Sequence, residues 1–156
     1  AASDVYKRQL VIVREMTDNL VLDLFEKGLV TNSLTLWIAY DHRYEHEASK
    51  GTVKLERESN SSKKIIDAVE DLYLRIADRY TGIRRIEVCA NRVAPESYVQ
   101  YSLFDDPKQT DKERHLQEAV LNVKQRYGKN TIMRGSNLLE CSTYRERNEQ
   151  IGGHRA

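Results

Sequence analysis

The 156-residue chain has few of the residues that mark several protein classes. Its two cysteines, Cys89 and Cys141, are far apart, which excludes a disulfide scaffold and a CxxC metal knuckle and is compatible with a reducing cytosol. No run approaches the roughly 20 apolar residues that a membrane span needs, and no basic start leads into a signal-peptide core. Seven glycines and two prolines exclude a collagen-like chain.

An excess of charge of one sign is also lacking. Lys and Arg number 25 and Asp and Glu number 24, so the net charge is only +1. The net charge therefore does not indicate a polyanion partner. Any nucleic-acid-binding surface must come from basic residues that gather locally. Hydrophobic residues make up 40% of the chain and the mean hydropathy is −0.67, which predicts one modest core.

Hydrophobic spacing predicts two helices in the first two thirds of the chain. Apolar residues recur every three or four positions in the first helix, which begins at Leu10 and ends at Gly28. The second helix follows the cap residues of 59–62 and ends at Thr81 and Gly82. The predicted core residues of the two helices are Val13, Met16, Leu20, Leu24, Ile65, Val69, Leu72 and Ile76, with Ile66, Tyr73 and Tyr80 beside the second stripe.

Alternating polarity predicts three strands, over 34–40, from Gly51 and from Ile83. The order α-β-β-α-β predicts an α+β fold, a two-layer sandwich with both helices on one face of a small sheet. We expect this domain to span 10–95, followed by a linker over 96–110 and a C-terminal helix and extended tail over 111–156. Residues 1–9 have no periodicity and are expected to be a non-native leader.

The last predicted helix starts with a capping box formed by Thr110 and Glu113. Its predicted apolar face then carries Leu116, Val120, Val123 and Tyr127, and Gly128 ends the helix.

No enzymatic motif stands out. His42, Glu45 and His46 match the H-x-x-E-H zinc string, but that string needs a helix and these residues follow a strand in a polar loop. A solvated loop is the favoured interpretation. A small metalloenzyme stays an alternative function only if a metal binds His42 and His46. No glycine-rich phosphate loop is present, and we assign no catalytic and no metal-binding residue.

Basic residues gather on the second and third strands. If both helices cover one face of the sheet, Thr35, Trp37 and Asn91 project from the other face together with several cations. Such a face could lie along a phosphate backbone, whereas the alternative is a sheet surface made soluble by Lys and Arg and diluted by Glu56 and Glu87. The candidate DNA-binding residues are Lys50, Thr52, Lys54, Arg57, Arg84 and Arg85.

The linker contains the pentapeptide Gln100, Tyr101, Ser102, Leu103 and Phe104. A Gln before a Leu-Phe pair in an extended segment suits docking into an apolar pocket, with Leu103 and Phe104 as the anchors. The alternative is that both anchors pack onto the domain's own core.

Several of these segments together resemble the C-terminal part of bacterial Y-family (UmuC/DinB-like) translesion DNA polymerases. The resemblance runs from about Leu10 to the end of the chain. The segments that carry it are EMTDNLVLDLFEKGLVT, SKGTVKLERESNSSKKIIDAVEDLYLRI, IRRIEVCANRV, RYGKNTIMRGSNLLE and RNEQIGGHRA.

The resemblance implies a little-finger domain, whose sheet lies against duplex primer-template DNA through phosphate contacts. It implies roles in DNA repair and the SOS response, a cytoplasmic, nucleoid-associated location, and a sliding clamp as the partner of residues 100–104. The parent enzyme would be a nucleotidyltransferase that needs Mg²⁺, but its catalytic carboxylates belong to a palm domain that has no counterpart here, so no cofactor is expected in this chain.

Two features depart from the family pattern. Tyr101 stands where the clamp-binding pentapeptide usually has Leu, and the first strand of the little finger is missing, which leaves an exposed sheet edge. An alternative function is a protein-interaction module, in which the C-terminal helix and tail dock a recombinase filament or another replication partner.

Overall fold

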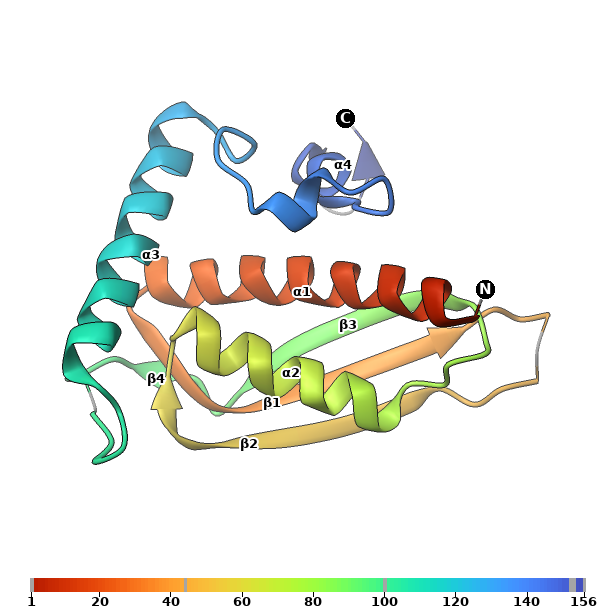
Figure 1. Cartoon of the computed structure of the whole chain (residues 1–156), viewed down its shortest axis with the longest axis horizontal. Helices are drawn as coiled ribbons and strands as arrows, with labels where there is room; N and C mark the ends of the chain where they lie inside the picture. The colour runs from red at the N-terminus through yellow and green to blue at the C-terminus, as the bar shows by residue number, and fades with distance from the viewer. Residues whose placement is uncertain (1, 44, 100, 152–153, 156) are drawn as a thin grey trace.

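The computed structural model describes residues 2–43, 45–99, 101–151 and 154–155. The fold is α+β, as the sequence predicts, with two helices on one face of an antiparallel sheet (Figure 1). The elements in chain order are α1 (Ala2–Glu26), β1 (Leu29–Tyr40), β2 (Ser49–Ser59), α2 (Ser62–Ile76), β3 (Ile83–Asn91), β4 (Ala94–Pro95), α3 (Pro107–Tyr127), the 3₁₀ helix η1 (Gly135–Leu138), α4 (Tyr144–Asn148), β5 (Gln150–Ile151) and β6 (His154–Arg155).

Helix α1 ends where the sequence predicts but begins earlier. Gly28 adopts a left-handed φ of +61°, which a residue with a side chain rarely tolerates, and its N–H donates to the Phe25 carbonyl at 3.1 Å. At the other end, residues 2–9 continue the helix instead of preceding it, and the Tyr6 ring stacks on Tyr73 with centroids 5.1 Å apart. That residues 1–9 are a non-native leader stays a prediction, but the described part of this segment contributes to the fold.

Helix α2 begins where the sequence predicts and ends earlier than predicted. The Ser61 hydroxyl caps it by accepting from the Lys64 N–H. The helix stops at Ile76 rather than at Thr81, because the Asp78 carboxylate accepts hydrogen bonds from the Tyr80 N–H and the Thr81 hydroxyl, and these local bonds compete with the helix. Tyr80 is consequently 84% exposed and lies outside the core.

Strand β1 is the centre of the sheet, with β2 on one side and β3 on the other. All pairings are antiparallel, and the short β4 pairs with the start of β1. Within the described part of the chain, β2 and β3 are therefore the two edges of the sheet.

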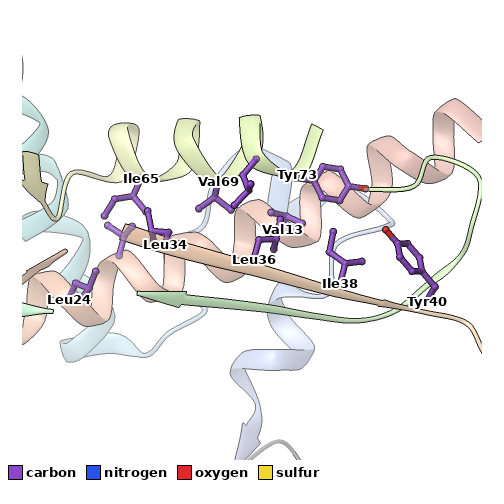
Figure 2. Close-up of a cluster of buried hydrophobic side chains, with 11 residues drawn as sticks. Val13, Leu24, Leu34, Leu36, Ile38, Tyr40, Ile65, Val69 and Tyr73 are labelled. Carbon is purple, nitrogen blue, oxygen red and sulfur yellow. The ribbon is translucent and has the colours of Figure 1, made fainter. Parts of the chain in front are cut away.

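The core lies between the sheet and the pair α1 and α2 (Figure 2). The predicted alternation of β1 is confirmed, because Leu34, Leu36 and Ile38 are fully buried and face the helices. Gly51 of β2 lies beneath α2, where an added Cβ would come within 2.8 Å of the Leu72 Cδ1. The close approach of α2 to β2 therefore requires glycine at this position.

Helix α3 starts before the predicted capping box. Asp106 is its cap and Pro107 opens its first turn, an arrangement that suits the fixed φ of proline. Glu113 instead accepts from the Ser61 hydroxyl and the Lys63 N–H, both at 2.8 Å, so it helps to cap α2.

The packed face of α3 is also different from the predicted one. Gln117 is buried, accepts from the Ser62 N–H at 3.2 Å and donates to the Asn60 carbonyl at 3.0 Å, whereas Leu116 is 64% exposed. Because the contacts of α3 with α2 are largely polar, the predicted apolar face is only partly packed: Val120 and Val123 are half-buried, whereas Leu116 and Tyr127 are exposed.

The segment after α3 was expected to be an extended tail, but it contains η1, α4 and the β5–β6 hairpin and folds back over α1 (Figure 1). The buried Glu15 of α1 accepts from the Ser142 hydroxyl at 2.5 Å and from Arg147 at 2.9 Å. Burial lowers the pKa of Arg147, and the neighbouring Glu15 opposes that effect. Tyr144 is buried beside Lys124, so polar pairing anchors the tail.

Two leucines provide a matched test of the core. Leu36 is completely buried and Leu103 is 98% exposed, so the same truncation removes packing at only one site. We expect Leu36→Ala to lower the free energy of unfolding by about 2–5 kcal/mol and Leu103→Ala by less than about 0.5 kcal/mol, measured by urea denaturation. Equal losses would contradict the assignment of the core.

The anchoring of the tail can be tested at Glu15. Glu15→Gln removes the charge that compensates Arg147 and should lower the free energy of unfolding by about 1–3 kcal/mol. The loss is limited because the Arg147 side chain is still 24% exposed to solvent. Glu118→Gln on the exposed side of α3 is the control and should change stability little. Urea denaturation measures both variants. An equal loss of unfolding free energy in Glu15→Gln and Glu118→Gln would argue against a buried pair.

Candidate nucleic-acid interface

The face of the sheet opposite the helices is organised by the pairing of β1 with its two neighbours. Residues that pair directly across antiparallel strands project on the same side. Four β1 residues, Ser33, Thr35, Trp37 and Ala39, are therefore the centres of cross-strand rows on the open face. The rows are Lys54–Ser33–Asn91, Thr52–Thr35–Cys89, Lys50–Trp37–Glu87 and Ala39–Arg85.

Hydroxyl and amide groups occupy the middle of this face. The Thr35 and Thr52 hydroxyls are 2.9 Å apart, and the Asn91 amide donates to the Thr35 hydroxyl at 2.8 Å. The same amide also reaches the Ser33 hydroxyl at 3.3 Å. These bonds hold small polar side chains flat against the sheet, so the long cationic side chains at the edges protrude furthest.

Three cations and one carboxylate lie in the rows of the open face, and the exposed Glu56 follows Lys54 along β2. Lys50 and Lys54 are exposed on β2, and Arg85 is exposed on β3. The carboxylate in these rows is that of Glu87, which lies 2.5 Å from the Arg85 guanidinium. A half-exposed pair of this kind screens Arg85 but leaves its remaining donors available.

The structure brings together four of the six candidate DNA-binding residues, Lys50, Thr52, Lys54 and Arg85. The other two lie at irregular positions. Arg84 is the extra residue where the β1–β3 register shifts, between the pairs Ala39–Arg85 and Tyr40–Ile83.

Arg57 lies in the part of β2 where the register with β1 shifts, and it donates to the Tyr101 carbonyl at 3.1 Å. It therefore contacts the linker. The prediction missed both irregularities because it assumed unbroken alternation, whereas each register shift puts the two sides of the strand out of phase. Ser33 was missed as a member of the open face because the predicted strand began one residue later, at Leu34.

The described residues of the H-x-x-E-H segment, 42–43 and 45–46, lie between β1 and β2 outside any helix or strand, as expected. His42 is exposed, and His46 contacts the Asp78 carboxylate at 3.2 Å and the Tyr40 ring. Hydrogen bonds from Thr81 and the Tyr80 backbone, with the charge of His46, lower the pKa of Asp78. Among the described residues, no three His, Cys, Asp or Glu side chains are placed to hold a metal ion.

The linker presents its two apolar anchors to solvent, and the alternative that they pack on the core is wrong. Leu103 is 98% exposed and Phe104 is 94% exposed. Gln100, the first residue of the pentapeptide, lies outside the described residues. The segment is also a turn rather than extended, since the Asp105 N–H donates to the Ser102 carbonyl at 3.1 Å.

Comparison with known proteins adds to this geometry. The model of the impB/mucB/samB family C-terminal domain matches residues 5–103, which is more than half of the chain. The chain belongs to this family. Its match covers the described helices α1 and α2, the sheet and the start of the linker turn.

The impB/mucB/samB match agrees with a curated relative, the protein named DNA polymerase IV 2 from Bacillus subtilis (strain 168). The two are 30% identical over 102 residues, which is 65% of this chain and 24% of the relative. The chain thus spans about a quarter of the length of that relative, and it carries the C-terminal domain of a Y-family DNA polymerase. No solved structure matches. None of the described helices is both long and apolar enough to cross a membrane.

Proposed function

We propose that this impB/mucB/samB C-terminal domain is the DNA-holding and clamp-tethering part of a translesion DNA polymerase that acts in DNA repair and damage tolerance. The DNA is the primer-template duplex, including damaged duplex, and it lies along the open face of the sheet. We place this activity in the cytoplasm, at the nucleoid, as part of the SOS response. The partner of the linker turn is the sliding clamp.

The observation that carries the DNA-binding proposal is the arrangement of the open face. Lys50 and Lys54 on one edge strand and Arg85 on the other flank a centre of hydroxyl and amide groups. Cations that protrude beyond short polar groups suit contact with the two phosphate backbones of a duplex. Such contacts do not depend on the base sequence, as a polymerase that copies any template requires.

The proposal includes no catalytic step in this chain. Nucleotidyl transfer by a polymerase uses Mg²⁺ held by carboxylates. The proposal assigns this chain's residues to holding DNA and the clamp.

Charge reversal tests the DNA-binding face. We expect the Lys54→Glu, Arg85→Glu double variant to lose about tenfold or more in affinity for a fluorescent primer-template duplex, measured by anisotropy at about 50 mM salt. Removing two phosphate contacts should also reduce the slope of log affinity against log salt by about 2. The control, Lys112→Glu with Lys129→Glu, changes net charge equally at exposed sites outside the sheet.

An equal loss in the control variant would show a general charge effect and contradict the proposed face. A second readout is the exposed Cys89 thiol in the Thr35 row. Bound duplex should slow its alkylation, while the half-buried Cys141, in the tail over α1, reacts at an unchanged rate. Unaltered alkylation of Cys89 at saturating DNA would place the DNA elsewhere.

The clamp proposal rests on the exposure of Leu103 and Phe104. Burial of two such side chains in a pocket contributes about 1.5–3 kcal/mol each, enough to anchor a short peptide. The described residues 101–104 resemble the last four positions of the clamp-binding pentapeptide, with Tyr101 as the departure.

We expect the Leu103→Ala, Phe104→Ala double variant to lose retention on an immobilised sliding clamp from Bacillus subtilis in a pull-down. Leu138→Ala with Leu139→Ala is the matched control, because these residues are also an adjacent exposed apolar pair, 66% and 52% exposed, in the tail. Retention of the first variant would exclude the linker turn as the clamp site.

Exposed apolar groups on α3 and the tail favour a second candidate function, docking of a recombinase filament or another replication partner. Leu116, Leu138 and Leu139 are all more than half exposed, although Tyr144 and Arg147 are used within the chain. A partner footprint confined to residues 110–156, with normal DNA binding, would favour this candidate.

A further inference from the structure

The Leu103–Phe104 turn is held by its own backbone and side chains. The Ser102 N–H donates to the Asp105 carboxylate at 3.1 Å, and the Phe104 N–H donates to the Ser102 hydroxyl at 3.3 Å. With the Asp105 N–H bond to the Ser102 carbonyl, these contacts close a four-residue turn in which Leu103 and Phe104 occupy the two central positions. Both anchors therefore project from the tip.

Three different elements brace this turn from outside. Lys64 of α2 lies 2.7 Å from the Asp105 carboxylate, and Arg57 of β2 donates to the Tyr101 carbonyl. The Tyr101 hydroxyl donates to the Asp111 carboxylate of α3 at 2.7 Å. The hydrogen bonds from Lys64 and the Ser102 backbone lower the pKa of Asp105, and the bond to Asp111 raises the pKa of Tyr101.

These contacts mean that Tyr101 is already hydrogen-bonded within the chain. A leucine in its place would have no polar group to bond to α3, whereas the tyrosine hydroxyl donates to Asp111 of that helix. The carbonyl of the same residue accepts from β2, so Tyr101 is bonded on both sides at the base of the turn.

We propose that Tyr101, together with Lys64, is a positioning residue that preorganises the Leu103–Phe104 turn for the sliding clamp, instead of being an anchor that enters the clamp pocket. The inference rests on the proposed clamp function. A turn already held in one conformation loses less conformational entropy on binding, so the braces raise affinity without touching the partner.

The decisive experiment compares the full chain with a synthetic peptide of residues 99–106, which lacks β2, α2 and α3. Clamp affinity is measured by isothermal titration with the Bacillus subtilis sliding clamp. Tyr101→Phe in the full chain keeps the ring and removes the bond to Asp111, and we expect about a threefold to tenfold loss of affinity. The same change in the peptide should have no effect, because the peptide has no brace to lose.

Two matched controls separate positioning from other effects. Lys64→Met should weaken clamp binding as Tyr101→Phe does, whereas Lys63→Met at the adjacent position, whose partner is Asp67, should not. Tyr80→Phe, at an 84% exposed site, controls for loss of any tyrosine hydroxyl. Duplex affinity and the melting temperature should stay unchanged in all four variants.

An equal loss for Tyr101→Phe in peptide and chain would mean that the hydroxyl touches the clamp, and it would overturn the positioning role. Unchanged binding of Tyr101→Phe and Lys64→Met, with loss for Leu103→Ala and Phe104→Ala, would overturn the inference and leave the clamp function standing. Unchanged binding after truncating both anchors would overturn the clamp function itself.

Discussion

The N-terminus of α2 is the point on which the arrangement of the molecule depends. A helix leaves its first N–H groups without partners, and here they are satisfied by Ser61 and by two residues of α3, Glu113 and Gln117. The capping of one helix is thus also the docking of another. Because α2 itself packs on the sheet, this junction connects the helical end of the chain to the open face.

The contact between the N-terminus of α2 and α3 also determines the path of the linker. The chain leaves the sheet at β4, and Glu96 accepts from Arg114 at 2.7 Å and from Asn60 at 3.2 Å, so both ends of the linker lie close together. Between these points, residues 102–105 close into a turn beside the first turn of α2. In the proposed function, the clamp site therefore lies beside α2 and β2, in contact with the domain that carries the DNA face.

Much of the domain could be predicted from sequence because its signals are local and apolar. The alternation of Leu34, Leu36 and Ile38 determined which face of β1 is buried, and with it the face that carries Lys50, Lys54 and Arg85. What could not be predicted depends on polar contacts between distant segments. Glu15 is two residues from the core position Val13 and is not itself apolar, so only the folded tail explains why it is buried.

The pair formed by Glu15 and Arg147 joins residues 132 positions apart in the sequence. Closing so long a loop costs more conformational entropy than closing the short loop between β1 and β2. The core around β1 needs no contribution from this pair. The apolar core around β1 and the polar contacts that hold the tail against α1 are therefore separate layers of the fold.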